Sequence, residues 1–297
     1  MKAFKFLSNT ALAFSLVLLA SCSSNDDFEE TGYKKQKLEF KAVIESSDVT
    51  RATLESNYSM SWDENDEISV FCDKAEECVK FGIAPSSFDG SVATFTNYGE
   101  VLPLWFDPDN FYYALYPDKN ATFEVETKKI TSVLPTNQTV SSGRTYDQQA
   151  LLMVACADKD ERIFNFKNIP ALVKVTISNN ATGKVKFIEI ESKSAENRLS
   201  GNFEVCPEYN SEVINFVATS SAEKKHTVKL QIPASEEKQD FYLAVLPGRV
   251  DGLTLKFEND NSVVYARGSD KTVEFKPSKI YDFGTYDIEQ VVPDVNN

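Results

Sequence analysis

Apolar and polar residues alternate with a period of two along much of the chain. In residues 37–44, KLEFKAVI, the apolar residues Leu38, Phe40, Ala42 and Ile44 would share one face of a β-strand. Similar runs occupy residues 184–190, 226–232, 240–247, 252–259 and 271–277. Turn-forming clusters such as FDGS, NATGK and ARGSD separate the runs. Short strands between regular turns predict an all-β protein built from β-sandwiches.

The charged stretch ADKDER, residues 157–162, is the predicted boundary between two domains. A first series of strands begins near Lys37, and a new series opens after the boundary with IFNFKNIPALVKVTI. We therefore expect an N-terminal sandwich at residues 37–158 and a C-terminal sandwich at 161–297. Residues 145–157 are ambiguous, and a short helix there is one alternative.

The first residues have the pattern of a secretory signal. Lys2 and Lys5 precede an apolar stretch at residues 11–20, which is too short for a stable membrane span. The stretch ends in Leu-Ala-Ser-Cys, which resembles the lipobox of bacterial lipoproteins. The resemblance implies a signal peptide at residues 1–21 and lipidation of Cys22, and two or more acyl chains would anchor the protein stably.

Residues 22–36 form the predicted tether between the lipid and the first strand. The tract SSNDDFEE is acidic and is similar to the segment that follows the lipidated cysteine in surface-exported lipoproteins of the Bacteroidota. Its composition is also that of a solvated, disordered linker, and the two interpretations agree.

The chain is strongly acidic, with a formal charge of −14 over 297 residues. Loss of residues 1–21 removes two lysines and no acid, so the mature charge falls to −16. Such a surface argues against nucleic acid or anionic lipid as a partner. The 21 phenylalanines and 12 tyrosines suit a β-rich protein.

Four cysteines follow Cys22 in the sequence. Cys72 and Cys78 flank DKAEE between two strand-like runs, so they either form a disulfide across a hairpin or remain two unpaired strand thiols. The sequence leaves the states of Cys156 and Cys206 open. No CxxC spacing is present, which disfavours a zinc site.

The sequence offers little for catalysis. The one histidine, His226, is in phase with the apolar residues of 226–232, which predicts a strand-end contact with the core. No glycine-rich phosphate loop and no HExxH motif occur. The acidic cluster WDENDE, residues 62–67, could supply calcium ligands, but a turn before the strand EISVF is favoured. We expect no enzymatic activity, no cofactor and no metal.

Several segments occur in an order that resembles the fimbrillin superfamily of Bacteroidota surface proteins. After the lipobox and tether come MSWDENDEISVF at 60–71, IFNFKNIPALVKVTI at 163–177, LAVLPGRVDGLTLKF at 243–257 and FKPSKIYDFGTYDI at 275–288. The resemblance spans nearly the whole chain. It implies two tandem transthyretin-like β-sandwiches after a lipoprotein signal, and a structural or adhesive role in type V pili.

The resemblance also implies processing by an arginine-specific protease after the first strand. The matching bond here is Arg51–Ala52, in the polar stretch SSDVTR that suggests an exposed loop. An ordinary loop arginine, like Arg144, is the alternative. Loss of the strand that carries Leu38, Phe40, Ala42 and Ile44 would open a groove for a strand of another subunit.

The place of the chain in a fibre is expected to be tip-like or anchor-like more than stalk. Stalk subunits of the superfamily carry further C-terminal strands, whereas here EQVVPDVNN follows residue 288 and Pro293 cannot donate to a ladder. Other fimbrillin-like subunits and the outer membrane, through the lipid on Cys22, are the expected partners. The expected location is the cell outer membrane, surface-exposed, or the fimbrium.

A non-polymerising surface lipoprotein that binds glycans or host proteins is the alternative function. Exposed aromatic side chains would carry such binding, and Trp105 and Phe106 in LPLWFDPDNFYY are the candidates. Packing in the core or in an interface is the competing role for both residues.

Overall fold

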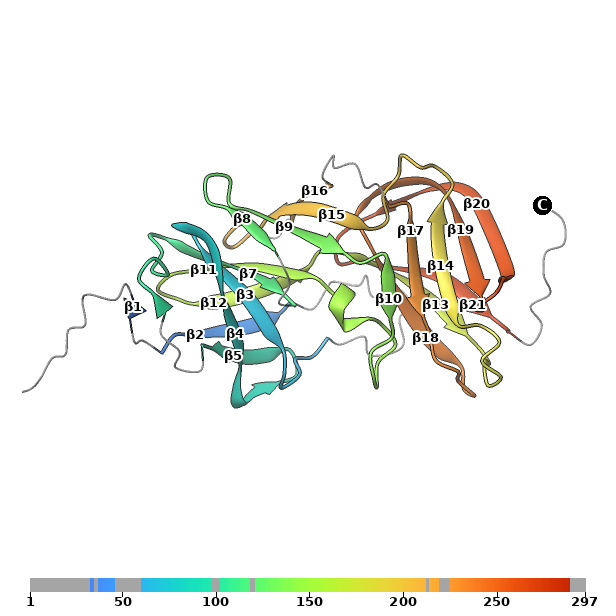
Figure 1. Cartoon of the computed structure of the whole chain (residues 1–297), viewed down its shortest axis with the longest axis horizontal. Helices are drawn as coiled ribbons and strands as arrows, with labels where there is room; N and C mark the ends of the chain where they lie inside the picture. The colour runs from blue at the N-terminus through green and yellow to red at the C-terminus, as the bar shows by residue number, and fades with distance from the viewer. Residues whose placement is uncertain are drawn as a thin grey trace, which may run out of the picture. The chain divides into compact units, whose positions relative to one another are not determined.

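Nearly all regular secondary structure of the described chain is β-strand, so the predicted all-β class is confirmed (Figure 1). The computed structural model describes residues 33–34, 37–45, 60–97, 102–117, 121–211, 214–218 and 225–288. Within these ranges the one helical element is a 3-10 turn, η1 (Gln148–Ala150), which lies in the ambiguous segment 145–157. No helix of the described residues is long and apolar enough to cross a membrane.

The N-terminal strands form a sheet that closes on itself, called here the seven-strand ring. Its order is β11–β12–β2–β5–β4–β3–β7, and β7 pairs with β11 to close it. The strands are β2 (Glu39–Ile44), β3 (Glu67–Cys72), β4 (Ala75–Asp89), β5 (Val92–Thr96), β7 (Phe111–Tyr116), β11 (Met153–Asp158) and β12 (Ile163–Asn168). Among the strand pairs of the ring, only β12 and β2 run parallel, and the others are antiparallel.

The interior of the seven-strand ring is filled by inward side chains of all its strands, as closure requires. Aromatic residues dominate this core, and Phe40, Trp62, Phe81, Phe95 and Phe164 are among its fully buried members. The ring extends past the predicted domain boundary, because β12 pairs with β2 and places Phe164 in this core.

The C-terminal strands form two sheets around a second core. A five-stranded sheet has the order β10–β17–β14–β19–β20, and a three-stranded sheet the order β18–β13–β21. Their bounds are β10 (Asn137–Thr139), β13 (Ala171–Ile177), β14 (Phe187–Ser192), β17 (Thr227–Gln231), β18 (Gln239–Val245), β19 (Gly248–Glu258), β20 (Val263–Phe275) and β21 (Ile280–Tyr286). Aliphatic side chains of both sheets meet between them.

A further sheet links strands that precede the seven-strand ring's last two strands to strands of the C-terminal half. Its order is β16–β15–β9–β8, from β8 (Thr122–Glu124), β9 (Lys129–Leu134), β15 (Gly201–Cys206) and β16 (Asn215–Ala218). A third apolar cluster joins Phe71 and Leu115 of the ring to Phe203 and Tyr242 of the C-terminal half. The described residues from Tyr33 onward form one compact unit. The division into two domains at 158–161 stays a prediction.

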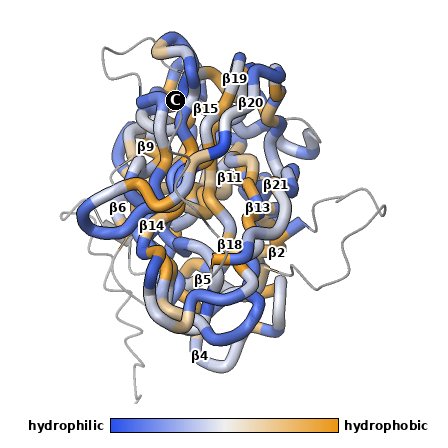
Figure 2. Tube along the Cα trace, turned by 90° about the vertical axis from the view of Figure 1, so that its right-hand side faces the viewer, coloured by the Kyte–Doolittle hydropathy of each residue, from blue (hydrophilic) through white to orange (hydrophobic). Residues whose placement is uncertain are grey.

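Hydropathy follows this architecture (Figure 2). Hydrophobic segments run along strands such as β13 and β18, and hydrophilic segments gather at turns. A two-stranded ladder, β1 (Tyr33–Lys34) with β6 (Leu102–Pro103), completes the described strands. Burial of alternate side chains on most strands is the physical basis for the period of two in the sequence.

Candidate functional site

The first long strand, β2, is the candidate functional element, and it is held along both edges. It pairs antiparallel with β5, from Glu39 opposite Thr96 to Val43 opposite Val92. On its other edge it pairs in parallel with β12, from Lys41 opposite Ile163 to Ile44 opposite Phe166. Removal of β2 would therefore leave two ladders unmade and would open the ring.

The apolar face of β2 points into the ring. Leu38, Phe40, Ala42 and Ile44 are all buried, with at most 5% of any of them exposed, whereas Lys37, Glu39 and Lys41 are exposed. This division follows from the strand period, because successive side chains point to opposite faces. The space that β2 occupies is called here the first-strand slot.

Phe40 occupies an aromatic box inside the first-strand slot. Its ring stacks on Phe164 at 4.8 Å between centroids and meets Phe81 and Tyr112 edge-on at 5.1 and 4.8 Å. Such pairs contribute beyond the area that they bury. Phe40 is thus the side chain of β2 whose contacts stabilise the bound strand most, and removal of β2 would break all of them.

The described residues on either side of the segment 46–59 contact the same turn. Ile44 N–H donates to the carbonyl oxygen of Ser91 at 2.8 Å, and Trp62 Nε1–H donates to the same oxygen at 3.0 Å. Trp62 N–H donates to the Gly90 carbonyl at 2.9 Å. Gly90 has a φ of +56°, a conformation that glycine adopts without strain. The Gly90–Ser91 turn therefore holds both Ile44, before this segment, and Trp62, after it.

Trp62 is packed at the end of the first-strand slot. Its indole is buried and meets Phe95, Tyr116 and Phe166 edge-on at 5.0 to 5.5 Å. The sequence places Trp62 before a turn, and the structure agrees: residues 64–65 form the turn, and β3 begins at Glu67. The chain at Trp62 is thus anchored mainly by contacts with residues outside β2.

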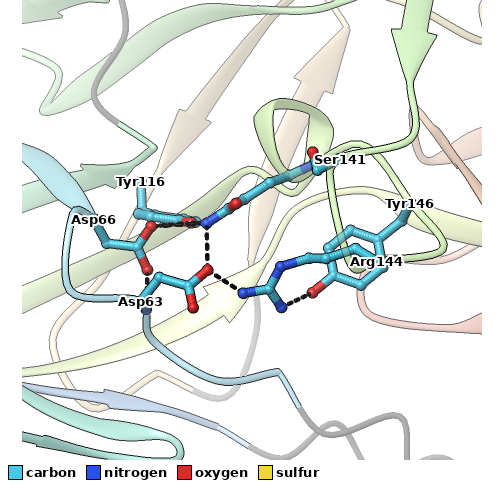
Figure 3. Close-up of polar contacts among 7 residues, drawn as sticks. Asp63, Asp66, Tyr116, Ser141, Arg144 and Tyr146 are labelled. Carbon is cyan, nitrogen blue, oxygen red and sulfur yellow. Dashed lines mark hydrogen bonds and ion pairs between the residues drawn. The ribbon is translucent and has the colours of Figure 1, made fainter.

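The acidic turn after Trp62 makes a network of polar contacts, called here the polar clasp (Figure 3). Asp66 accepts hydrogen bonds from the Tyr116 hydroxyl at 2.8 Å, from Gln148 Nε2 at 2.8 Å and from Asp63 N–H at 2.7 Å. Arg144 forms an ion pair with Asp63. The clasp ties the turn to the segment around η1, and its carboxylates already have partners.

Arg144 was expected to be an ordinary loop arginine. Its guanidinium donates to the Tyr146 hydroxyl at 2.6 Å as well as pairing with Asp63, and only 17% of its side chain is exposed. Arg144 is therefore a positioning residue in the polar clasp. The one sequence signal for such a partner was the density of acids in WDENDE.

Protonation of Asp66 gives a pH-dependent prediction. Burial raises the pKa of this carboxyl, against the hydrogen bonds from Asp63 N–H and Tyr116 that lower it. Because the folded-state pKa is raised, the folded protein binds a proton at Asp66 more readily than the unfolded chain does. The stability that this proton contributes is fully present below the unfolded-state pKa of the carboxyl and is lost as the pH rises through the folded-state pKa. Wild type should therefore gain stability relative to Asp66→Asn as the pH falls from 7 towards 4.

Urea unfolding of both proteins at several pH values measures this difference. Glu64→Gln, at an exposed position of the same turn, is the control and should show a smaller pH dependence relative to wild type. A difference between wild type and Asp66→Asn that is constant with pH, or that changes in the opposite direction, contradicts the prediction.

Three of the expected site residues lie outside the described residues: Cys22, Arg51 and Ala52. The disulfide between Cys72 and Cys78 is not formed. In the β3–β4 ladder, the residue opposite Cys72 is Ala75 and not Cys78. Cys72 is buried, and its thiol donates to the Trp105 carbonyl at 3.3 Å. Cys78 is exposed. The two side chains thus lie on different faces of the hairpin.

The alternative binding and catalytic candidates are placed as follows. Phe106 is buried, and Trp105 is half-buried against the ring core and edge-on to Phe106, so neither forms an exposed platform. His226 precedes β17 and is half-buried, and its Nε2 lies 3.6 Å from Glu191. In the described part of the chain, no group of three or more His, Cys, Asp and Glu side chains is arranged to hold a metal ion.

Comparison with known proteins concerns the fold. No known protein-family profile and no curated protein matches the sequence. A solved structure of a candidate cell adhesion protein from Bacteroides ovatus is similar, with 14% identity and a TM-score of 0.50, over 87% of this chain and 94% of that one. A candidate cell adhesion protein from Bacteroides uniformis has 14% identity and a TM-score of 0.48, over 84% and 92%.

The tip fimbrial protein Mfa3 from Porphyromonas gingivalis is more distant, with 9% identity and a TM-score of 0.32, over 78% of this chain and 81% of that one. Identities of this size relate folds and not activities. The chain shares its fold with a candidate cell adhesion protein of Bacteroides.

Proposed function

We propose that the protein is a surface-exposed fimbrillin-like lipoprotein that serves as a structural or adhesive component of type V pili. The observation that carries the proposal is the position of β2, which is paired on both edges and buried on one face in the seven-strand ring. An element in this position can be replaced by an equivalent strand of another subunit, the exchange known as donor-strand complementation.

Processing at Arg51–Ala52 is the proposed trigger. A cut there separates β2 from the rest of the chain and also separates the body of the protein from the lipid on Cys22. Trp62 and the polar clasp support this step, because both hold the chain after the cut mainly through contacts with residues outside β2. The processed subunit keeps its ring but holds its first strand only by noncovalent contacts.

An arginine-specific protease tests the proposal directly. Brief digestion of the full-length protein should give a new N-terminus at Ala52, and the fragment that carries β2 should remain bound afterwards. A labelled peptide with the sequence of residues 37–45 should then replace the fragment, whereas the same peptide with aspartate in place of Phe40 should not. Arg51→Gln is the matched control and should block cutting, exchange and release from the membrane.

The outcomes separate the candidate roles. Cutting followed by exchange supports a subunit that accepts a donor strand, as a tip subunit does. Resistance at Arg51 with retention in the membrane fraction fits an anchor. Cutting with no exchange by any strand peptide contradicts the donor-strand proposal and favours a surface lipoprotein that binds glycans or host proteins.

A further inference from the structure

The C-terminal half contains a second groove, separate from the first-strand slot. A cavity of about 270 Å³ lies between β19, β20 and β21. Leu253, Leu255, Val273, Phe283 and Tyr286 supply its apolar walls, together with the cationic residues Arg267 and Lys271. It is called here the β20–β21 groove.

Two sheet edges border this groove. β20 is the last strand of the five-stranded sheet, and β21 is the last strand of the three-stranded sheet. Among the described residues, β20 pairs only with β19, and β21 only with β13. The outer edge of each strand therefore presents backbone groups that another strand could pair with.

The core is incompletely covered at this border. On β21 every residue is at least partly exposed, although Phe283 and Tyr286 pack against the core. On β20 every residue between Val264 and Phe275 is likewise at least partly exposed. By contrast, Leu253 and Leu255 on the neighbouring β19 are buried. Core residues therefore form the bottom of the groove, and solvent-exposed residues of β20 and β21 form its sides.

Tyrosine contacts close the groove at both ends. The Tyr281 hydroxyl donates to the Glu274 carbonyl at 2.6 Å and accepts from Lys276 N–H at 2.9 Å. At the other end Tyr265 and Tyr286 lie 6.1 Å apart between ring centroids. The open part of β20 between these ends is long enough for a short added strand, since each residue spans about 3.3 Å.

The residues of β20 that line the groove are unusual for the inner face of a sheet. Arg267, Ser269, Lys271 and Val273 all line it, and Arg267 and Ser269 lie opposite the buried Leu255 and Leu253. Inward charged residues on an edge strand can simply guard against aggregation. Here they also border a cavity with an apolar floor.

The charge of this groove is opposite to that of the molecule as a whole. The chain carries −14, yet the groove presents a guanidinium and an ammonium group. The nearby acid Asp270 is paired with Lys193 at 2.6 Å, and Asp282 lies 3.6 Å from Lys174. Complementary charge selects partners, so the favoured occupant is acidic.

We propose that the β20–β21 groove binds an extended peptide segment of a partner protein, in which acidic and apolar residues alternate along one face. The segment adds to the outer edge of β20. Its apolar side chains cover Phe283 and Val273, and its carboxylates, four residues apart, face Arg267 and Lys271. This site includes neither β2 nor Arg51, so the peptide-binding proposal can be tested separately from the proposed pilus function.

A capped, fluorescein-labelled peptide Val-Thr-Glu-Thr-Val-Thr-Glu is the probe, and fluorescence anisotropy with the intact full-length protein is the measurement. It should bind saturably, and hydrogen exchange of β20 amides should slow. The same peptide with lysine in place of glutamate should bind at least tenfold more weakly. A peptide N-methylated on the pairing edge should not bind, because it cannot extend the sheet.

Charge reversal locates the site. The double variant R267E with K271E should bind the acidic peptide at least tenfold more weakly and should bind the lysine peptide better than wild type does. The control variant K41E with K238E makes the same change in net charge at exposed positions outside the groove and should behave as wild type.

Other results overturn the proposal. Absence of binding by the acidic peptide means that the charged residues of β20 only guard the edge. Equal binding of the acidic and lysine peptides, or equal losses in the two double variants, means that the groove does not select charge. Binding with slowed exchange only in other strands places the peptide elsewhere.

Discussion

Phe40→Ala should lower the free energy of unfolding by about 3–5 kcal/mol, the range for loss of a fully buried phenylalanine. Phe40 is fully buried and contacts Phe81, Tyr112 and Phe164, which cannot all move inward to fill the space. Urea unfolding followed by tryptophan fluorescence measures the change. In the cut protein, the same substitution should also speed the loss of the first-strand fragment.

Lys41→Ala is the matched control, because Lys41 is the next residue of β2 and is exposed. Its effect should stay within about 0.5 kcal/mol, as for most surface substitutions. If Phe40→Ala changes stability as little as Lys41→Ala does, β2 is not a packed part of the seven-strand ring in solution.

Trp62→Ala should also destabilise by about 3–5 kcal/mol, because it removes a buried indole from among three aromatic rings. Trp62→Phe should cost less: it keeps most ring contacts and loses the hydrogen bond to Ser91, whose net contribution is about 1 kcal/mol. The Ser91 oxygen still accepts from Ile44 in this variant. Chemical denaturation measures both changes.

The second tryptophan supplies the comparison. Trp105 is half-buried against the same core, so Trp105→Ala should be clearly less destabilising than Trp62→Ala. The chain has only these two tryptophans, so each variant reports the fluorescence of the other one alone. Equal losses at the two positions would show that Trp62 does not anchor the end of the first-strand slot.

Local patterns predicted local structure well. The alternation in residues 37–44 indicates a strand with Leu38, Phe40, Ala42 and Ile44 on one face, and this strand is β2. Its neighbours could not be predicted in the same way. The β12 partner lies more than 100 residues further along the chain, and closure of the ring depends on that parallel pair. Periodicity assigns a face to a strand and does not assign its partner.

Two further cases show what periodicity and spacing leave open. His226 shares the phase of Val228 and Leu230 but lies just before β17, and it is half-buried, whereas Val228 and Leu230 are fully buried. Cys72 and Cys78 flank a hairpin turn, but spacing does not reveal that one thiol points inward and the other outward.

The polar clasp and the β20–β21 groove were not predicted from the sequence. Arg144 reaches a carboxylate on a turn far away in the sequence, and a pairing of this kind needs the fold before it can be seen. Arg267 and Lys271 look like solvent-facing residues of an edge strand. Only the position of β21 shows that they border a cavity with an apolar floor.

The Gly90–Ser91 turn also has a kinetic consequence. While the chain is intact, β2 is joined through residues 45–61 to Trp62, which stays bound beside the slot. A strand that leaves is therefore retained at an effective concentration on the order of millimolar, so a dilute competitor cannot exclude it. Once the connection is cut, return of the strand becomes a second-order process. A competing strand that has no effect on the intact chain can then replace β2, at a rate set by the concentration of the competitor.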